Sequence, residues 1–96
     1  MIVLFFGSEN CKKCKQFLLQ YSLLDFPKDI DFVYIDIHKE DNQELCDLLE
    51  VDKSPCTIIT ENIDGEDFKP LFRRDGYFHP SLLKKELWSL IVNKKK

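Results

Sequence analysis

The sequence predicts an α/β fold in which a mixed four-stranded sheet is flanked by three helices, in the order βαβαββα. Short runs of apolar, β-branched and aromatic residues, typical of buried strands, alternate with segments whose apolar residues recur at helical spacing. The initial strand–helix–strand unit implies two parallel strands joined by a right-handed crossover. The Asp64-Gly65 pair marks a hairpin turn, so an antiparallel pair should extend the same sheet.

The first strand and the first helix are the clearest elements. Residues 2–6, with the sequence IVLFF, form a continuous apolar run, as expected of a strand that is buried on both faces. Gly7 ends this run. Apolar side chains then recur at helical spacing over residues 11–24, and Pro27 stops the helix that they predict.

A second strand and a short helix follow. Residues 31–37, with the sequence DFVYIDI, are rich in β-branched and aromatic residues and predict a second buried strand. Residues 41–50, with the sequence DNQELCDLLE, place their leucines on one face behind an Asp or Asn cap. This pattern predicts a short helix.

The last part of the chain predicts a hairpin and a final helix. Residues 56–60 form the third strand and residues 68–72 the fourth. Because proline cannot donate a hydrogen bond to a strand ladder, Pro70 places the fourth strand at an edge of the sheet. Pro80 then opens the last helix, whose leucines form an apolar stripe.

Length and composition exclude several classes of protein. The 96 residues suggest one domain spanning residues 1–96, and a hydrophobic fraction of 44% is that of a folded chain. The formal net charge of −3 argues against general nucleic-acid binding, which needs a clustered basic surface. The sequence shows neither a signal peptide nor an apolar run of bilayer length. We therefore expect a cytoplasmic monomer that binds neither nucleic acid nor a membrane.

Two cysteines, Cys11 and Cys14, stand in a CxxC pattern within the stretch FGSENCKKCKQF. Because the cytoplasm keeps thiols reduced, the four cysteines of the chain are expected to be reactive or metal-binding rather than a structural disulfide framework. A CxxC by itself fits a redox pair, half of a metal site or two thiols that are close by chance.

The position of the pair favours redox chemistry. Cys11 falls at the start of the first predicted helix, where unpaired N–H groups and the helix dipole stabilise an anion and lower a thiol pKa from about 8.5. Lys12, Lys13 and Lys15 add positive charge nearby. Cys14 lies one turn further in and should be more shielded, so Cys11 would attack a disulfide and Cys14 would resolve the mixed disulfide.

These segments together resemble the thioredoxin and glutaredoxin superfamily. The resemblance covers nearly the whole chain, and it is carried by GSENCKKC, VDKSPCTII and RRDGYFHPSLLKKEL. It is closest to a short glutaredoxin-like thioredoxin, and it implies the thioredoxin-like fold. The implied activity is that of a thiol–disulfide oxidoreductase that acts on protein or small-molecule disulfides without a bound cofactor. The implied electron donor is a reductase or glutathione.

The resemblance also assigns a role to the proline before the third strand. The family carries a cis-proline opposite its CxxC, and Ser54-Pro55 occupies that place, so Ser54 and Pro55 are expected to position the substrate. Thioredoxins keep a buried acid in the first strand as a proton acceptor for the second cysteine, and this position is Phe5 here. Lys12-Lys13 replaces the usual Gly-Pro, and GYFHPSLL lacks the acidic pair that helps glutaredoxins hold glutathione.

The remaining cysteines leave further alternatives open. Cys56 follows Pro55 directly and is either a small buried strand residue or a third thiol near the pair. Cys46 stands among leucines and is predicted to pack in the core. A structural zinc site needs four ligands at motif spacing, which this sequence lacks, so no metal is expected. The competing function is a non-catalytic module that binds a partner, zinc or an iron–sulfur cluster.

Overall fold

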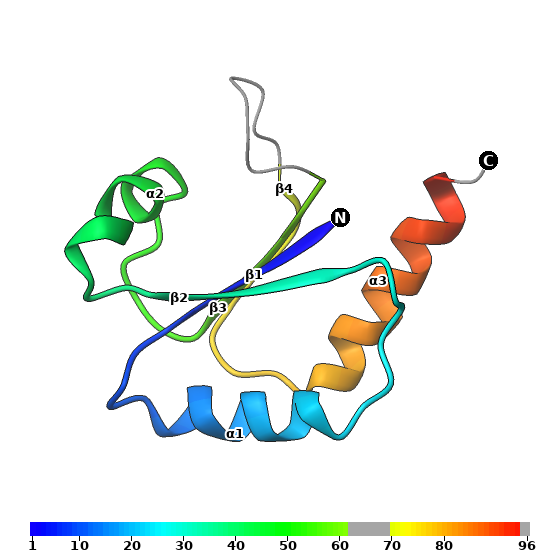
Figure 1. The fold of residues 1–96 in the computed structure, drawn as a ribbon, viewed down its shortest axis with the longest axis horizontal. Helices are drawn as coiled ribbons and strands as arrows, with labels where there is room; N and C mark the ends of the chain where they lie inside the picture. The colour runs from blue at the N-terminus through cyan, green and yellow to red at the C-terminus, as the bar shows by residue number, and fades with distance from the viewer. Residues whose placement is uncertain (62–69, 95–96) are drawn as a thin grey trace.

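The computed structural model describes residues 1–61 and 70–94, and its elements follow the predicted order (Figure 1). The strands are β1 (Ile2–Gly7), β2 (Asp31–Asp36), β3 (Cys56–Thr60) and β4 (Pro70–Asp75). The helices are α1 (Lys12–Ser22), α2 (Gln43–Leu48) and α3 (Pro80–Lys94), and a short 3-10 turn, η1 (Glu40–Asn42), precedes α2.

The strands form one mixed sheet in the order β2-β1-β3-β4. β1 and β2 pair in parallel across the α1 crossover, whereas β3 pairs with both β1 and β4 in the antiparallel sense. The predicted strand directions are therefore confirmed. β4 lies at an edge of the sheet, as expected, and Pro70 is its first residue, a position where a strand tolerates proline.

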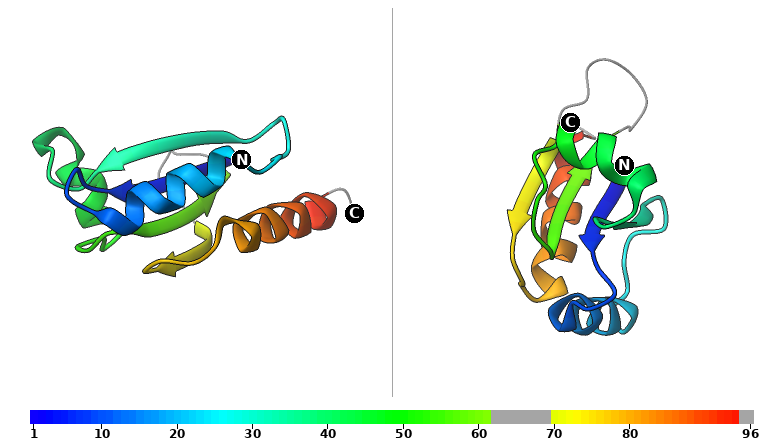
Figure 2. Two further views of the ribbon diagram at one scale, coloured as in Figure 1. Left: turned by 90° about the horizontal axis from the view of Figure 1, so that it is seen from below. Right: turned by 90° about the vertical axis from the view of Figure 1, so that its left-hand side faces the viewer.

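The central strand β1 is buried on both faces because its apolar side chains alternate between two clusters. Val3 and Phe5 pack with α1 and α3 on one face, whereas Leu4 and Phe6 pack with α2 on the other. Figure 2 shows α2 and α3 on opposite sides of the sheet. We call these two groups the α1–α3 cluster and the α2 cluster.

The prediction of a second buried strand is wrong for β2. Because β2 lies at the edge of the sheet, Ile35 is its one buried residue, and Val33 and Tyr34 are 36% and 42% exposed. The β-branched and aromatic letters of this strand therefore reflect β propensity rather than burial on two faces.

Two helices are shorter than predicted. α1 ends at Ser22 rather than at residue 24, and the backbone N–H of Leu23 caps it by bonding to the carbonyls of the last turn. The segment 41–50 divides into η1 and the short α2, and a positive φ of 54° at Glu50 turns the chain out of the helix.

The fourth strand runs further than predicted. It extends to Asp75 rather than ending at residue 72, because it pairs along the whole length of β3. The predicted start of this strand at residue 68 and the turn at Asp64-Gly65 lie outside the described residues.

The last helix, α3, covers one face of the sheet through an apolar stripe. Leu83 and Leu87 are fully buried, which confirms the stripe predicted from their spacing. Within the described part of the chain, no helix is both long enough and apolar enough to cross a bilayer.

Candidate active site

Cys11 and Cys14 form a disulfide where the chain leaves β1 and enters α1. Their Cα atoms are 5.2 Å apart. Cys11 is the N-cap of α1, and its Sγ atom accepts a hydrogen bond of 3.1 Å from the backbone N–H of Cys14. This bond places the Cys11 sulfur where the unpaired N–H groups of the first turn stabilise negative charge.

The two sulfurs of the pair differ in exposure. Cys11 is half-buried, whereas Cys14 is 1% exposed and belongs to the α1–α3 cluster. One cysteine therefore lies near the surface and the other in the core.

Three lysines lie at the start of α1. Lys12, Lys13 and Lys15 are all exposed, and the backbone N–H of Lys15 donates to the Cys11 carbonyl at 3.2 Å. The start of the helix therefore carries positive charge next to Cys11.

The peptide bond between Ser54 and Pro55 is cis, as the resemblance implied. It lies next to the cysteine loop, because the Oγ atoms of Ser54 and Ser8 are 3.5 Å apart. The carbonyl of Ser8 in turn accepts a hydrogen bond of 3.2 Å from the backbone N–H of Cys11. The structure thus brings the cis-proline loop and the CxxC loop together.

A cavity of about 420 Å³ runs along the loop that ends in this cis peptide. Residues 51–55 line one part of it, and Arg73, Asp75 and Gly76 line the other. The cavity therefore lies between the cis-proline loop and the end of the edge strand β4.

Cys56 lies on the opposite face of the sheet from Cys14. It belongs to the α2 cluster and is 1% exposed, and its Sγ donates a hydrogen bond of 3.1 Å to Asp75 Oδ1. Burial first, and then the hydrogen bond and charge of Asp75, raise the pKa of the Cys56 thiol to about 12. The structure does not bring Cys56 together with the Cys11–Cys14 pair.

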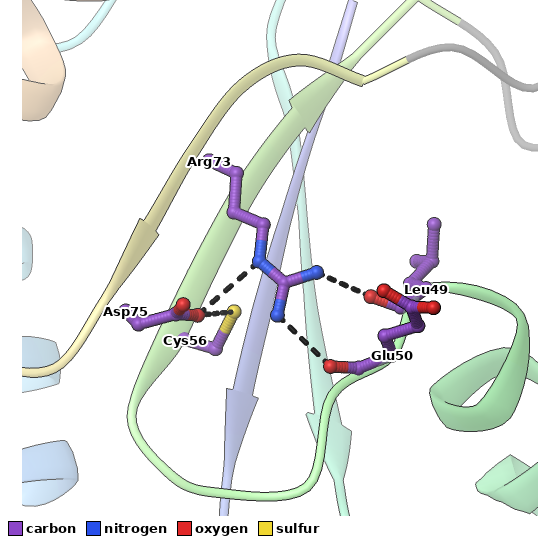
Figure 3. Close-up of polar contacts among 5 residues, drawn as sticks. All are labelled: Leu49, Glu50, Cys56, Arg73 and Asp75. Carbon is purple, nitrogen blue, oxygen red and sulfur yellow. Dashed lines mark hydrogen bonds and ion pairs between the residues drawn. The ribbon is translucent and has the colours of Figure 1, made fainter.

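Arg73 links β4 to the chain before the cis peptide (Figure 3). Its Nε donates to Asp75 Oδ1 at 3.2 Å, its Nη2 donates to the Glu50 carbonyl at 2.9 Å, and its Nη1 donates to the Leu49 carbonyl. The hydrogen bond from Cys56, followed by the positive charge of Arg73, lowers the pKa of the Asp75 carboxyl.

These bonds hold both ends of the loop formed by residues 51–55. Arg73 binds the two carbonyls that precede the loop, and Asp75 binds the residue that follows it. Sequence reasoning missed Arg73 and Asp75 because their partners lie about 20 residues away in the chain. The sequence carries only a weak signal for these contacts, since the charged residues Arg-Arg-Asp are also common on the solvent-exposed side of an edge strand.

Cys46 packs in the core, as predicted. It is 3% exposed within the α2 cluster, and burial, followed by the charge of Asp47, raises the pKa of its thiol. Across residues 1–61 and 70–94, no group of three or more His, Cys, Asp and Glu side chains is placed to hold a metal ion.

Phe5 lies in the α1–α3 cluster with Cys14. Its ring is fully buried and stacks on Phe17 with centroids 4.5 Å apart. The core around the buried cysteine is therefore aromatic at the position where the resemblance implied an acid.

Solved thioredoxin structures are similar to this chain over most of its length. Thioredoxin 1 from Thermosipho africanus TCF52B has 21% identity and a TM-score of 0.76, and the match covers 100% of both chains. The thioredoxin of Trichomonas vaginalis has 21% identity and a TM-score of 0.74, with 93% of this chain and 78% of that chain covered.

A third similar chain comes from the complex of ferredoxin:thioredoxin reductase with thioredoxin f2. It has 21% identity and a TM-score of 0.65, and 99% of this chain and 77% of that chain are covered. No model of a known protein family matches the sequence, and neither does any curated protein. At this level of identity, the matches establish the arrangement of strands and helices.

Proposed function

The chain has a thioredoxin-like fold, and from this premise we propose that it is a thiol–disulfide oxidoreductase that reduces disulfides with the dithiol of Cys11 and Cys14. The observation that carries the proposal is the asymmetry of the pair. Cys11 is half-buried at the N-terminus of a helix, whereas Cys14 is 1% exposed. Disulfide exchange needs one accessible thiolate and one neighbour that can displace what it captures.

In the first step, the Cys11 thiolate attacks one sulfur of the substrate disulfide. A bond forms between Cys11 Sγ and that sulfur, the substrate S–S bond breaks, and the other substrate sulfur leaves as a thiolate that takes up a proton from water. The N-terminus of α1 and the lysines Lys12, Lys13 and Lys15 support this step by stabilising the attacking anion.

In the second step, Cys14 attacks Cys11. The Cys14 thiol loses its proton to water, the bond between Cys14 and Cys11 forms, and the second substrate sulfur leaves as a thiolate. The substrate gains two electrons, and the protein is left as the disulfide. The Cα separation of 5.2 Å allows that bond without movement of the backbone.

Ser54 and Pro55 position the substrate in this proposal. Their loop touches the cysteine loop through Ser8 and borders the cavity of about 420 Å³ beside β4. A substrate peptide bound along this loop would approach the cysteine loop where Ser54 meets Ser8. We therefore propose disulfide-containing proteins as the substrate class.

Electrons would return to the dithiol from a reductase or from glutathione, without a bound cofactor. One similar chain belongs to a complex of a thioredoxin with a thioredoxin reductase, which favours a reductase as the partner. We propose a monomer that acts in the cytoplasm, where a reducing environment keeps the dithiol ready.

Insulin reduction, followed by turbidity with dithiothreitol as the electron donor, tests this function. The protein should speed precipitation of insulin chains well beyond dithiothreitol alone, and Cys11→Ser should abolish that acceleration. Cys46→Ala, which removes a buried cysteine outside the pair, should retain it. A protein no faster than dithiothreitol, or a fully active Cys11→Ser variant, would favour the non-catalytic binding module.

A further inference from the structure

The buried sulfur of Cys14 must become a thiolate before it can attack Cys11, because the thiolate is the nucleophile in disulfide exchange. Cys14 is 1% exposed and shares its cluster with the rings of Phe5, Phe17 and Phe78. Apolar surroundings disfavour the charged form of a thiol. A hydrogen-bond donor close to this sulfur would offset that penalty.

Tyr34 brings a hydroxyl group to the same place. A Cβ atom on Gly7 would stand 2.9 Å from the Tyr34 hydroxyl oxygen and 3.2 Å from Cys14 Sγ, so both atoms lie against one side of Gly7. The strand register explains this approach. Tyr34 of β2 pairs with Phe5 of β1, two residues before Gly7, so its side chain lies on the same face of the sheet.

The lack of a side chain at Gly7 makes room for Tyr34. A Cβ atom there would also stand 2.9 Å from Cε2 of the Tyr34 ring, closer than such contacts occur in proteins. Glycine in a strand often marks a site where another group approaches the backbone closely. Here the approaching groups are the tyrosine ring and the Cys14 sulfur.

Burial and nearby negative charge keep the Tyr34 hydroxyl protonated, so that it can donate a hydrogen bond rather than act as a base. Burial first, then the carboxylates of Asp36 on β2 and Glu9 in the loop before α1, raise the pKa of Tyr34. From α1, the titratable group beside the same face of Gly7 is Cys14. The phenol therefore keeps its proton at neutral pH, and its 42% exposure leaves the side chain in contact with water.

We propose that the Tyr34 hydroxyl donates a hydrogen bond to the Cys14 thiolate as it forms and thereby speeds resolution of the mixed disulfide. This inference rests on the proposed function. The proton of Cys14 passes to water, the bond between Cys14 and Cys11 forms, and the bond from Cys11 to the substrate breaks. The substrate sulfur leaves as a thiolate, and Tyr34 keeps its own proton throughout.

The test uses the pre-reduced protein and the chromogenic disulfide dithiobis-nitrobenzoate. The first coloured thiolate is released by attack of Cys11, and the second is released by attack of Cys14 on the mixed disulfide. We expect Tyr34→Phe to slow the second release about tenfold at neutral pH and to raise its pH midpoint by about one unit. The first release should be unchanged.

Two variants serve as controls. Tyr21→Phe removes a tyrosine hydroxyl two turns further along α1 and should change neither release. A variant with serine at both positions of the pair reports any colour that arises from Cys46 and Cys56. Gly7→Ala perturbs the whole site, since its Cβ crowds both the Tyr34 hydroxyl and Cys14 Sγ, and it should also slow the second release.

A second release with wild-type rate and pH midpoint in Tyr34→Phe would overturn this role of Tyr34 and leave the proposed function intact. Equal slowing of both releases would overturn it as well, because the hydroxyl would then not act on Cys14 in particular. A wild-type protein that releases no thiolate through Cys11 would overturn the proposed function itself.

Discussion

The thiol of Cys56 donates a hydrogen bond to Asp75 Oδ1 at 3.1 Å, across a pair of residues that face each other in β3 and β4. Arg73 holds the same carboxylate oxygen at 3.2 Å. A Cys56 thiolate would have no proton with which to form this hydrogen bond, and it would lie next to the negative charge of Asp75. We therefore expect Cys56 to act as a structural donor at the end of the cis-proline loop rather than as a nucleophile.

We expect Cys56 to resist alkylation in the folded protein near neutral pH, because the pKa of its thiol is raised to about 12. Iodoacetamide labelling of the reduced protein, read at each cysteine by mass spectrometry, measures this. Cys11 should be modified first and Cys56 only slowly. Asp75→Asn should speed labelling of Cys56, since the carboxylate no longer opposes the thiolate, whereas Asp41→Asn at an exposed site should not. Equal labelling of Cys11 and Cys56 would show a third reactive thiol.

The stability of the protein should decrease at alkaline pH because of the same residue. The pKa of Cys56 rises from 9.0 to about 12 on folding, so the folded state favours the neutral thiol. The contribution of Cys56 to the free energy of unfolding is fully present below pH 9.0, and it is lost as the pH rises through about 12. We expect urea unfolding at a series of pH values to show that the free energy of unfolding decreases less with rising pH in Cys56→Ala than in the wild type. Identical slopes in the two proteins would contradict this expectation.

Arg73→Lys should loosen the cis-proline loop. A lysine ammonium cannot reproduce the fork that binds Asp75, Glu50 and Leu49 together. We expect the free energy of unfolding to decrease by about 1–3 kcal/mol. Insulin reduction should slow, while the first thiolate release from the small chromogenic disulfide, which depends on Cys11 alone, should be retained.

Arg74→Lys is the matched control for this change. The Arg74 guanidinium lies over the Phe78 ring at 5.4 Å, a contact that a lysine can also make. Arg74→Lys should change both the free energy of unfolding and the rate of insulin reduction only slightly. An Arg73→Lys protein that behaves like Arg74→Lys would mean that the loop does not depend on the fork.

Thr57→Val should stabilise the protein. Thr57 is 1% exposed, and its Oγ1 atom has no hydrogen-bond partner within the described part of the chain. A buried hydroxyl without a partner costs about 1–3 kcal/mol, and valine has nearly the same shape. Since about 1 kcal/mol shifts the midpoint of thermal unfolding of a domain of this size by about 4–8 °C, we expect the midpoint to rise by at least about 4 °C. A lower midpoint would show that this hydroxyl has a partner in solution.

The placement of the cysteine pair could be predicted from the sequence because it depends on local neighbours, whereas the cis peptide at Pro55 was implied only by the resemblance to the thioredoxin and glutaredoxin superfamily. Gly7 ends a strand, the lysines follow Cys11 in a helix, and Pro55 directly precedes another strand. Pro70 likewise identified an edge strand through a single missing donor. Such features follow from chain chemistry within a few residues.

Tyr34 and Arg73 could not be predicted in this way, because their roles depend on strand order and register. The letters around Tyr34 suggested burial on both faces, yet the order β2-β1-β3-β4 leaves that strand at an edge. The pairing of Tyr34 with Phe5 then brings its hydroxyl group to the side of Gly7 where Cys14 Sγ also lies, an arrangement that no local pattern encodes. The bonds of Arg73 to Leu49 and Glu50 also depend on tertiary folding.

The most direct test of a reactive Cys11 is the ultraviolet absorbance of its thiolate against pH in the fully reduced protein, with Cys11→Ser subtracted. We predict a pKa clearly below the usual value of about 8.5, because the sulfur caps α1 beside three lysines. Replacing Lys12 and Lys13 with glutamine should raise that pKa towards the usual value. A wild-type midpoint at or above about 8.5 would contradict a thiolate nucleophile at Cys11.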